Sequence, residues 1–94
     1  MPSYFELIRI ATDEGRYVVS THADLRLRER RIEAWQIEAA MTEATLLCER
    51  PHDSPNPSVE AKILLPDGTA AKVIRSWFIR GQAAKLVSVR FFDR

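Results

Sequence analysis

The clearest hydrophobic pattern lies in the C-terminal third of the chain. Apolar and other side chains alternate there with a period of two, in the order Val59, Glu60, Ala61, Lys62, Ile63, Leu64 and Leu65. This period is typical of a strand. Pro66, Asp67 and Gly68 follow it, and they are turn residues because proline presets φ, aspartate bonds its own backbone and glycine accepts a left-handed conformation. A hairpin with a three-residue loop is predicted.

The register of this hairpin predicts which side chains share a face. If Leu65 pairs with Thr69, then Ile63 faces Ala71 and Ala61 faces Val73. We expect the pattern to continue along the second strand as far as Ile79, on the side that also carries Trp77. A turn at residues 80–82 with an odd number of loop residues then adds three residues of the last strand to this side, namely Val87, Val89 and Phe91. We expect this face to pack on helices.

The opposite face of the predicted sheet mixes apolar and basic side chains. Its expected members are Lys62, Leu64, Lys72, Ile74, Ser76, Phe78, Arg80, Leu86, Ser88, Arg90 and Phe92. Such a face is too apolar to be left wholly in water. We therefore expect the N-terminal helix, a second subunit or a ligand to cover part of it.

The N-terminal segment has two interpretations. Ser3 and Glu6 have the spacing of a capping box, and apolar residues then recur at helical intervals up to Gly15. These features predict a helix over residues 4–14. The alternative is a strand over residues 4–10, because tyrosine, phenylalanine and isoleucine favour strands.

The middle of the chain predicts two more helices between short strands. A strand is expected at 17–20, a helix at 23–31 that Ser20 or Thr21 caps, a helix at 33–43, a strand at 45–50 and a proline-rich loop at 51–58. In the helix at 33–43 the expected apolar stripe consists of Trp35, Ile37, Ala39, Ala40 and Met41, with Glu33 and Glu38 early in the helix or outside it. The predicted fold is a single α+β domain over residues 1–94, in which two or three helices precede and pack on an antiparallel, hairpin-linked sheet of about four strands.

Length and cysteine content limit the class of protein. A chain of 94 residues has a modest core, so association with a partner would help to stabilise it. Cys48 is the single cysteine, and it indicates a reducing cytoplasm or simply a small buried side chain. No apolar run is long enough to span a membrane and no signal peptide is evident, so a cytoplasmic protein is expected.

The charged residues argue for a local site rather than a whole-molecule field. The formal net charge is only +1, which does not drive a protein onto nucleic acid. However, 11 of the 14 basic residues are arginine, and four of them lie within residues 26–31. Because the planar guanidinium binds phosphate or carboxylate through two hydrogen bonds, this bias is compatible with an anion site.

The most specific candidate site is a row of polar residues in the second predicted helix. His22, Arg26 and Arg30 are spaced four apart and share one helical face, with Glu29 close by. Histidine exchanges protons near neutral pH and arginine binds phosphate, so this row predicts metal-free cleavage of a phosphodiester. In the competing interpretation the helix is a solvated surface on which Glu29 bridges Arg26 or another basic residue and His22 caps or packs.

Further candidate residues lie on the predicted sheet and in the proline-rich loop. Lys72, Arg80 and Arg90 on the sheet, interleaved with Phe78 and Phe92, are predicted to bind RNA phosphates and bases, or to form a dimer interface. His52 either pairs with His22 or lies in a solvent-exposed loop. No spacing typical of metal ligands or of a glycine-rich phosphate loop is present, so neither a metal nor a cofactor is predicted.

The segment from His22 to Ile32 has the form HAxxRxxERxI, and together with the C-terminal strand LVSVRFFDR it resembles the bacterial domain-of-unknown-function family 4258. The similarity covers the chain from about residue 17 to its end. It implies a fold akin to the RelE and BrnT toxins and, more distantly, to barnase and colicin D, which cut RNA without metal. The residues that match the family motif are His22, Arg26, Glu29 and Arg30, whereas Arg31 stands where the family commonly has glycine.

Two functional hypotheses follow. In the first, the chain is a toxin-like, metal-independent endoribonuclease in which His22 acts as acid or base, Arg26 and Arg30 bind the scissile phosphate and Arg90 assists. Its partners would be RNA and an antitoxin-like protein. In the second, the chain is a non-catalytic interaction module that forms a homodimer or a small complex through the sheet face bearing Phe78 and Phe92.

Overall fold

The computed structural model describes residues 3–92, and its first element is helix α1 (Tyr4–Asp13). The hydroxyl of Ser3 caps this helix by accepting a hydrogen bond of 3.2 Å from the backbone N–H of Glu6. The helix ends at Gly15, whose φ of 80° is the left-handed conformation that glycine adopts without strain. The predicted helix is confirmed, and the alternative of a strand over residues 4–10 is wrong.

Helix α2 (Thr21–Glu29) is tied to the last strand of the sheet through its N-cap. The cap is Ser20 rather than Thr21, since the Ser20 hydroxyl accepts from the N–H of Ala23 at 3.0 Å. The same hydroxyl donates to the carbonyl of Val87 at 2.8 Å. One side chain therefore begins α2 and fixes this end of the helix beside the last strand.

The helix predicted over residues 33–43 consists of α3 (Ala34–Ala40) followed by the 3-10 turn η1 (Met41–Glu43). Ile37 and Met41 are buried as expected. Two other predictions for this helix are wrong. Trp35 is 59% exposed although it was assigned to the apolar stripe, and Glu38 is buried although it was placed early in the helix or outside it.

The sheet has five strands, one more than expected. They are β1 (Tyr17–Val19), β2 (Thr45–Arg50), β3 (Ser58–Leu64), β4 (Ala70–Phe78) and β5 (Ala83–Phe91), and their order in the sheet is β1-β5-β4-β3-β2. The strands β2 to β5 are antiparallel neighbours, while β1 pairs with β5 in parallel. The α+β class, with helices packed on a largely antiparallel sheet, is confirmed.

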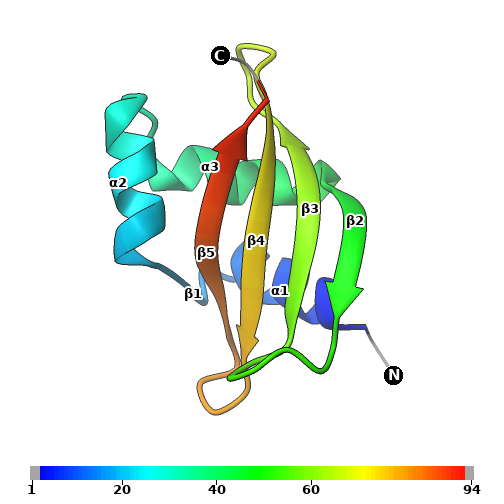
Figure 1. Ribbon diagram of the computed structural model, residues 1–94. Helices are drawn as coiled ribbons and strands as arrows, with labels where there is room; N and C mark the ends of the chain where they lie inside the picture. The colour runs from blue at the N-terminus through cyan, green and yellow to red at the C-terminus, as the bar shows by residue number, and fades with distance from the viewer. Residues whose placement is uncertain (1–2, 93–94) are drawn as a thin grey trace.

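All three helices in the described part of the chain lie on one side of the sheet or at its edge (Figure 1). Helices α1 and α3 cross behind the strands, and α2 stands beside β5. Phe5, Ile8 and Leu27 bring the helices into one core with the inward side chains of β3, β4 and β5. The other sheet face, called the open face below, carries no helix, so the N-terminal helix, one of the three expected ways of covering it, does not cover it. No helix in residues 3–92 is long and apolar enough to cross a membrane.

The β3–β4 hairpin has the predicted register. The N–H of Leu65 donates to the carbonyl of Thr69 at 2.8 Å, and the Asp67 carboxylate accepts from the N–H of Thr69 at 2.9 Å. Ile63 lies opposite Ala71. Gly68 has a φ of 92°, as the turn chemistry predicted.

The β4–β5 hairpin differs from the prediction in a way that decides the orientation of β5. Phe78 pairs with Ala83, so the loop spans residues 79–82 and has four residues, an even number. Leu86 is consequently buried, and its predicted place on the open face is wrong. Val87 is not a core residue either, because it is the extra residue of a β-bulge that lies between the pairs Arg75–Leu86 and Ile74–Ser88.

The bulge at Val87 returns the rest of β5 to the predicted orientation. Beyond it Val89 is buried and Phe91 packs against the core, so these two predictions are confirmed. Ile79 lies in the loop and is 56% exposed, which corrects its predicted place on the core side. The end of the C-terminal sequence motif, Asp93 and Arg94, lies outside the described residues.

A buried ion pair joins the helices to the middle of the sheet. Arg75 on β4 is 0% exposed and donates to both carboxylate oxygens of Glu38 on α3, at 2.8 and 2.7 Å. It also donates to the hydroxyl of Thr12 on α1 at 3.3 Å. The Nε of Arg75 is buried without a partner. Because both charges are removed from water, the loss of either partner would leave a costly unpaired charge.

Candidate functional site

Three basic residues stand directly beside one another across the open face. Lys62 on β3 is paired with Lys72 on β4, and Lys72 is paired with Arg90 on β5. We call these three residues the basic row. Neighbouring strands are about 4.8 Å apart, so the row is about 10 Å long.

Like charges in directly opposed positions destabilise a sheet, and the basic row is only partly neutralised. Glu60 forms ion pairs with Lys72, at 3.2 Å, and with Arg50. Within residues 3–92, the side chains of Lys62 and Arg90 form no ion pair. The row is therefore a local concentration of positive charge that Glu60 offsets only in part.

The basic row continues into a hollow between α2 and β5. β1 pairs with β5 only as far as Leu86, and beyond that residue α2 borders the edge of β5 (Figure 1). The hollow has a volume of about 260 Å³, and its lining includes Arg26, Glu29, Arg30, Arg90 and Phe91. We call it the α2–β5 hollow. Arg90 belongs both to this hollow and to the basic row.

One cation–π contact lies in the lining of the hollow, whereas the ion pair of helix α2 lies outside that lining. The guanidinium of Arg30 lies 4.3 Å from the centroid of the Phe91 ring, which is a cation–π contact. Glu29 forms no ion pair with Arg26, and the ion pair on the outer surface of α2 joins Arg28 to Asp24 at 2.9 Å instead. The predicted surface bridge between Glu29 and Arg26 is thus not present.

The chemistry of the α2–β5 hollow follows from its charges. Three guanidinium groups and one carboxylate line it, so it has an excess of positive charge. Guanidinium groups suit a phosphate group through paired hydrogen bonds. The carboxylate of Glu29 can accept a hydrogen bond or a proton from a hydroxyl beside that phosphate. The hollow therefore has the donors and the acceptor for a phosphate ester with a neighbouring hydroxyl group.

The structure brings only some of the predicted site residues together. Arg26, Glu29, Arg30 and Arg90 line one hollow, whereas His22 is exposed in the first turn of α2 and does not line it. His52 is exposed in the loop after β2, and no contact joins it to His22.

Arg80 does not share a patch with Lys72, contrary to the prediction. It lies in the loop after β4, eight residues along the chain from Lys72, and this separation is about 26 Å at roughly 3.3 Å per residue. Lys62 takes its place in the basic row. The signal for Lys62 was available, because the predicted Leu65–Thr69 register already places Lys62 opposite Lys72.

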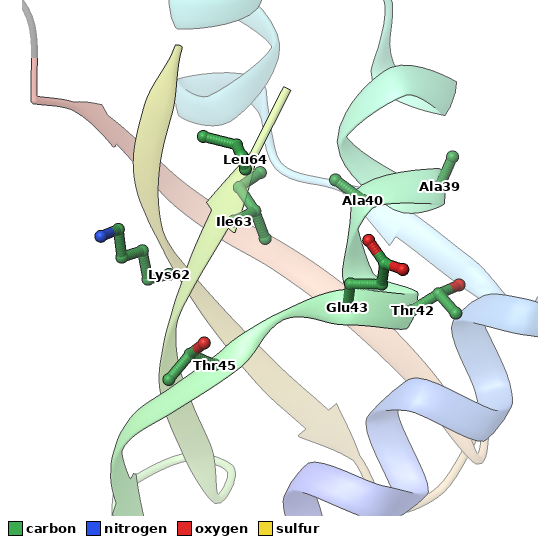
Figure 2. A pocket seen from close by; sticks show the side chains of 8 residues that line it. All are labelled: Ala39, Ala40, Thr42, Glu43, Thr45, Lys62, Ile63 and Leu64. Atoms are coloured by element: carbon green, nitrogen blue, oxygen red, sulfur yellow. The ribbon is translucent and has the colours of Figure 1, made fainter. Parts of the chain in front are cut away.

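A larger hollow lies elsewhere, between α3 and the end of β3 (Figure 2). Its volume is about 530 Å³, and its lining includes Ala39, Ala40, Glu43, Ile63 and Leu64. Figure 2 shows the Lys62 side chain extending away from it, on the other side of β3. Within residues 3–92 no three histidine, cysteine, aspartate or glutamate side chains gather closely enough to hold a metal ion.

Fold and site together define an α+β protein with a five-stranded mixed sheet whose helix-free face carries a basic row. No protein family, curated protein or solved structure matches the chain. The resemblance to family 4258 and to the RelE and BrnT toxins therefore stays a prediction.

Proposed function

We propose that this protein binds single-stranded RNA, with the phosphate backbone following the basic row and one phosphate held in the α2–β5 hollow. The observation that carries the proposal is the placement of Arg90, which joins the row on the open face to the arginines of the hollow. Phosphate contacts supply most of the sequence-independent affinity for nucleic acid. A continuous line of cations meets that requirement, although the net charge of the whole chain is close to zero.

An exposed aromatic ring beside the row favours a single strand over a duplex. Phe92 is 55% exposed, and it lies two residues beyond Arg90, directly after the end of β5. Unpaired bases stack on such rings, and stacking contributes about 1–3 kcal/mol per base. A duplex keeps its bases stacked inside and could not use this ring.

The charge of the open face also argues against its use as a homodimer interface. Two copies joined through this face would bring Lys62, Lys72 and Arg90 against the same cations of the partner. Like charges across an interface oppose association. The open face is therefore better suited to a polyanion than to a second copy of this chain.

The binding proposal is tested by fluorescence anisotropy with a labelled oligouridine of about ten nucleotides, a length within the usual range for one small domain. We expect Lys62→Ala and Arg90→Ala each to weaken binding by roughly three- to tenfold, as loss of one phosphate contact predicts. Arg80→Ala is the matched control, because Arg80 is an exposed arginine outside the row. Equal effects at Arg80 and Arg90, or no binding by the wild type at low salt, would contradict the proposal.

Cleavage of the bound strand is a second candidate function, and the position of Glu29 in the hollow favours it. The Glu29 carboxylate would take the proton from a ribose 2′-hydroxyl, and the 2′-oxygen would then attack the adjacent phosphorus. The bond from phosphorus to the 5′-oxygen breaks, and the leaving oxygen takes up a proton from the protonated Glu29 carboxyl, directly or through water. The products are a cyclic phosphate and a 5′-hydroxyl, and Glu29 is again ionised. The arginines would stabilise the charge that develops on the phosphate oxygens.

The cleavage candidate is tested by incubating the same RNA with the protein in the presence of a metal chelator. We expect a cyclic phosphate product with the wild type and a loss of rate of about a hundredfold or more in Glu29→Gln, as removal of a general base predicts. Binding of RNA should survive this substitution. His22→Ala tests the proton-donor role predicted for that histidine. RNA that is bound but stays intact would remove the cleavage candidate and leave the binding proposal standing.

A further inference from the structure

The α3–β3 groove is a second surface with the features of a binding site. We give this name to the large hollow of Figure 2 together with a smaller one of about 200 Å³ that adjoins it. The two hollows share Ala39, Ala40 and Leu64, and the smaller one extends to Trp35 and Pro66. The groove lies on the β2 side of the sheet, away from the α2–β5 hollow (Figure 1).

One wall of the groove is a free strand edge. The pairing of β2 with β3 begins at Thr45 and Lys62, so Leu64 has no strand partner on that side among the described residues. Leu65 directs its N–H toward β4, where it bonds to Thr69. Peptide groups alternate in direction along an antiparallel strand, so the N–H and C=O of Leu64 face the groove. A free edge of this kind can accept an added strand.

The other walls are formed by exposed apolar residues and by small side chains. Leu64 and Trp35 are 64% and 59% exposed, and they are the two most exposed large apolar side chains among residues 3–92. Both line the α3–β3 groove. Ala39 and Ala40 form the helical wall between them, and their small side chains leave room for another backbone to approach (Figure 2). Exposed apolar surface gathered at one groove is typical of an interaction site.

Two charged residues in the lining of the groove, Glu43 and Lys62, form no ion pair within the described chain. Figure 2 shows the Glu43 carboxylate beside Ala40, while Lys62 extends away on the other side of β3. Within the described chain the Glu43 side chain forms no ion pair. A partner that presents a cation at this end of the groove would be complementary to it, whereas an acidic partner would be repelled.

We propose that the α3–β3 groove binds a short extended segment of a partner protein, which pairs with the edge at Leu64, places an apolar side chain against Trp35 and presents a basic side chain to Glu43. Trp35 and Glu43 are eight residues apart along α3 and η1, which is about 12 Å at roughly 1.5 Å per residue. Because alternate side chains of a strand share a side and four strand residues span about 13 Å, the apolar and basic residues of the segment stand four positions apart. This site shares no residue with the α2–β5 hollow. Lys62 belongs both to the basic row and to the lining of the groove, but its side chain extends away from the groove (Figure 2).

The probe is a capped, mostly threonine peptide with leucine and arginine four positions apart, compared with a second peptide that has glutamate in place of arginine. We expect the arginine peptide to shift the emission of Trp35 to shorter wavelength in a saturable way and to move the amide resonance of Leu64. Methylation of the peptide nitrogens that face Leu64 should weaken binding by about tenfold, because main-chain hydrogen bonds are lost. Trp35→Phe should abolish the emission change, since Trp77 is buried.

Two variants and one control make the test specific. Glu43→Lys should reverse the preference, so that the glutamate peptide binds better than the arginine peptide. Leu64→Ser should weaken both, while Ile79→Ser, at an equally accessible apolar residue in the β4–β5 loop, should change neither. The proposal would be overturned if wild-type protein bound the two peptides equally or showed no saturable change. It would also be overturned if the wild type were a dimer that Leu64→Ser dissociates, and that outcome would assign the groove to a second copy.

Discussion

Arg31 shows how a single residue can carry backbone strain in this protein. It follows helix α2 with a φ of 57°, in the left-handed region. The N–H of Ile32 bonds back to the carbonyl of Leu27 at 2.9 Å, and the N–H of Arg31 bonds to Arg28 at 3.1 Å. These two bonds define a Schellman motif, in which glycine is preferred at the left-handed position. Helix α1 ends in the same motif with Gly15 at that position.

We expect Arg31→Gly to raise the free energy of unfolding by about 1 kcal/mol, because glycine adopts the left-handed conformation without a steric penalty. Equilibrium unfolding in urea measures the change. Arg31→Ala is the control, since it removes the same side chain but keeps the strain, and it should leave stability nearly unchanged. An equal gain from both substitutions would instead assign the effect to the loss of a positive charge.

At the scale of elements, two features decide how the site is assembled. The bulge at Val87 shifts the pairing register of the end of β5 by one residue, and this shift places Arg90 opposite Lys72 on the open face. Without that extra residue, Arg90 would lie opposite Ala71 on the core side. Ser20 then fixes the start of α2 to the same bulge through the Val87 carbonyl. The basic row and the α2–β5 hollow are therefore positioned by one local irregularity.

The buried pair of Glu38 and Arg75 holds α3 to the middle of the sheet, and its removal gives a prediction at this scale. Glu38→Leu should lower the free energy of unfolding by about 3–5 kcal/mol, because Arg75 would remain charged in the core. The double variant Glu38→Leu, Arg75→Met should recover most of that loss. Urea unfolding followed by the fluorescence of buried Trp77 measures both. Arg28→Ala, which breaks an exposed ion pair, should cost less than about 1 kcal/mol. A double variant no more stable than Glu38→Leu alone would contradict this account.

At the scale of the whole molecule, the charge is unevenly distributed although its sum is small. All three lysines of the chain lie on the open face of the sheet, where the acidic residue Glu60 stands among the basic side chains Arg50, Lys62, Lys72, Lys85 and Arg90. The net charge of +1 therefore conceals a positive face. The absence of a whole-molecule field, read from the sequence, does not exclude a local one.

This distribution predicts the salt dependence of RNA binding. If the row and the hollow together contact about four phosphates, the logarithm of the binding constant should fall with the logarithm of salt concentration with a slope of about −3. Lys62→Ala should reduce the magnitude of that slope by about 0.7, and Arg80→Ala should not change it. Titrations between about 50 and 200 mM salt measure it. A slope near zero would mean that phosphate contacts do not drive binding.

Local patterns in the sequence predicted much of the fold. The capping residue Ser3 and the stop at Gly15 bounded helix α1, and the turn residues Pro66, Asp67 and Gly68 fixed the register of the β3–β4 hairpin. These features depend on residues close together in the chain, so the sequence is sufficient. Arg26, Glu29 and Arg30 come from one helix and its C-cap and line one hollow, whereas His22 of the same predicted row does not.

The tertiary structure alone decided the features that depend on distant parts of the chain. The orientation of Arg90 depends on a loop of four residues and a bulge that no local pattern marked. The burial of Glu38 depends on Arg75, 37 residues away. Arg75 is in phase with the inward residues Val73 and Trp77. The burial of a single arginine in such a pattern cannot be predicted until its acidic partner is known. The sequence therefore determined the helices and strands and where they begin and end. Packing determined which charges share a face, because contacts between residues far apart in the chain set how strands and helices align.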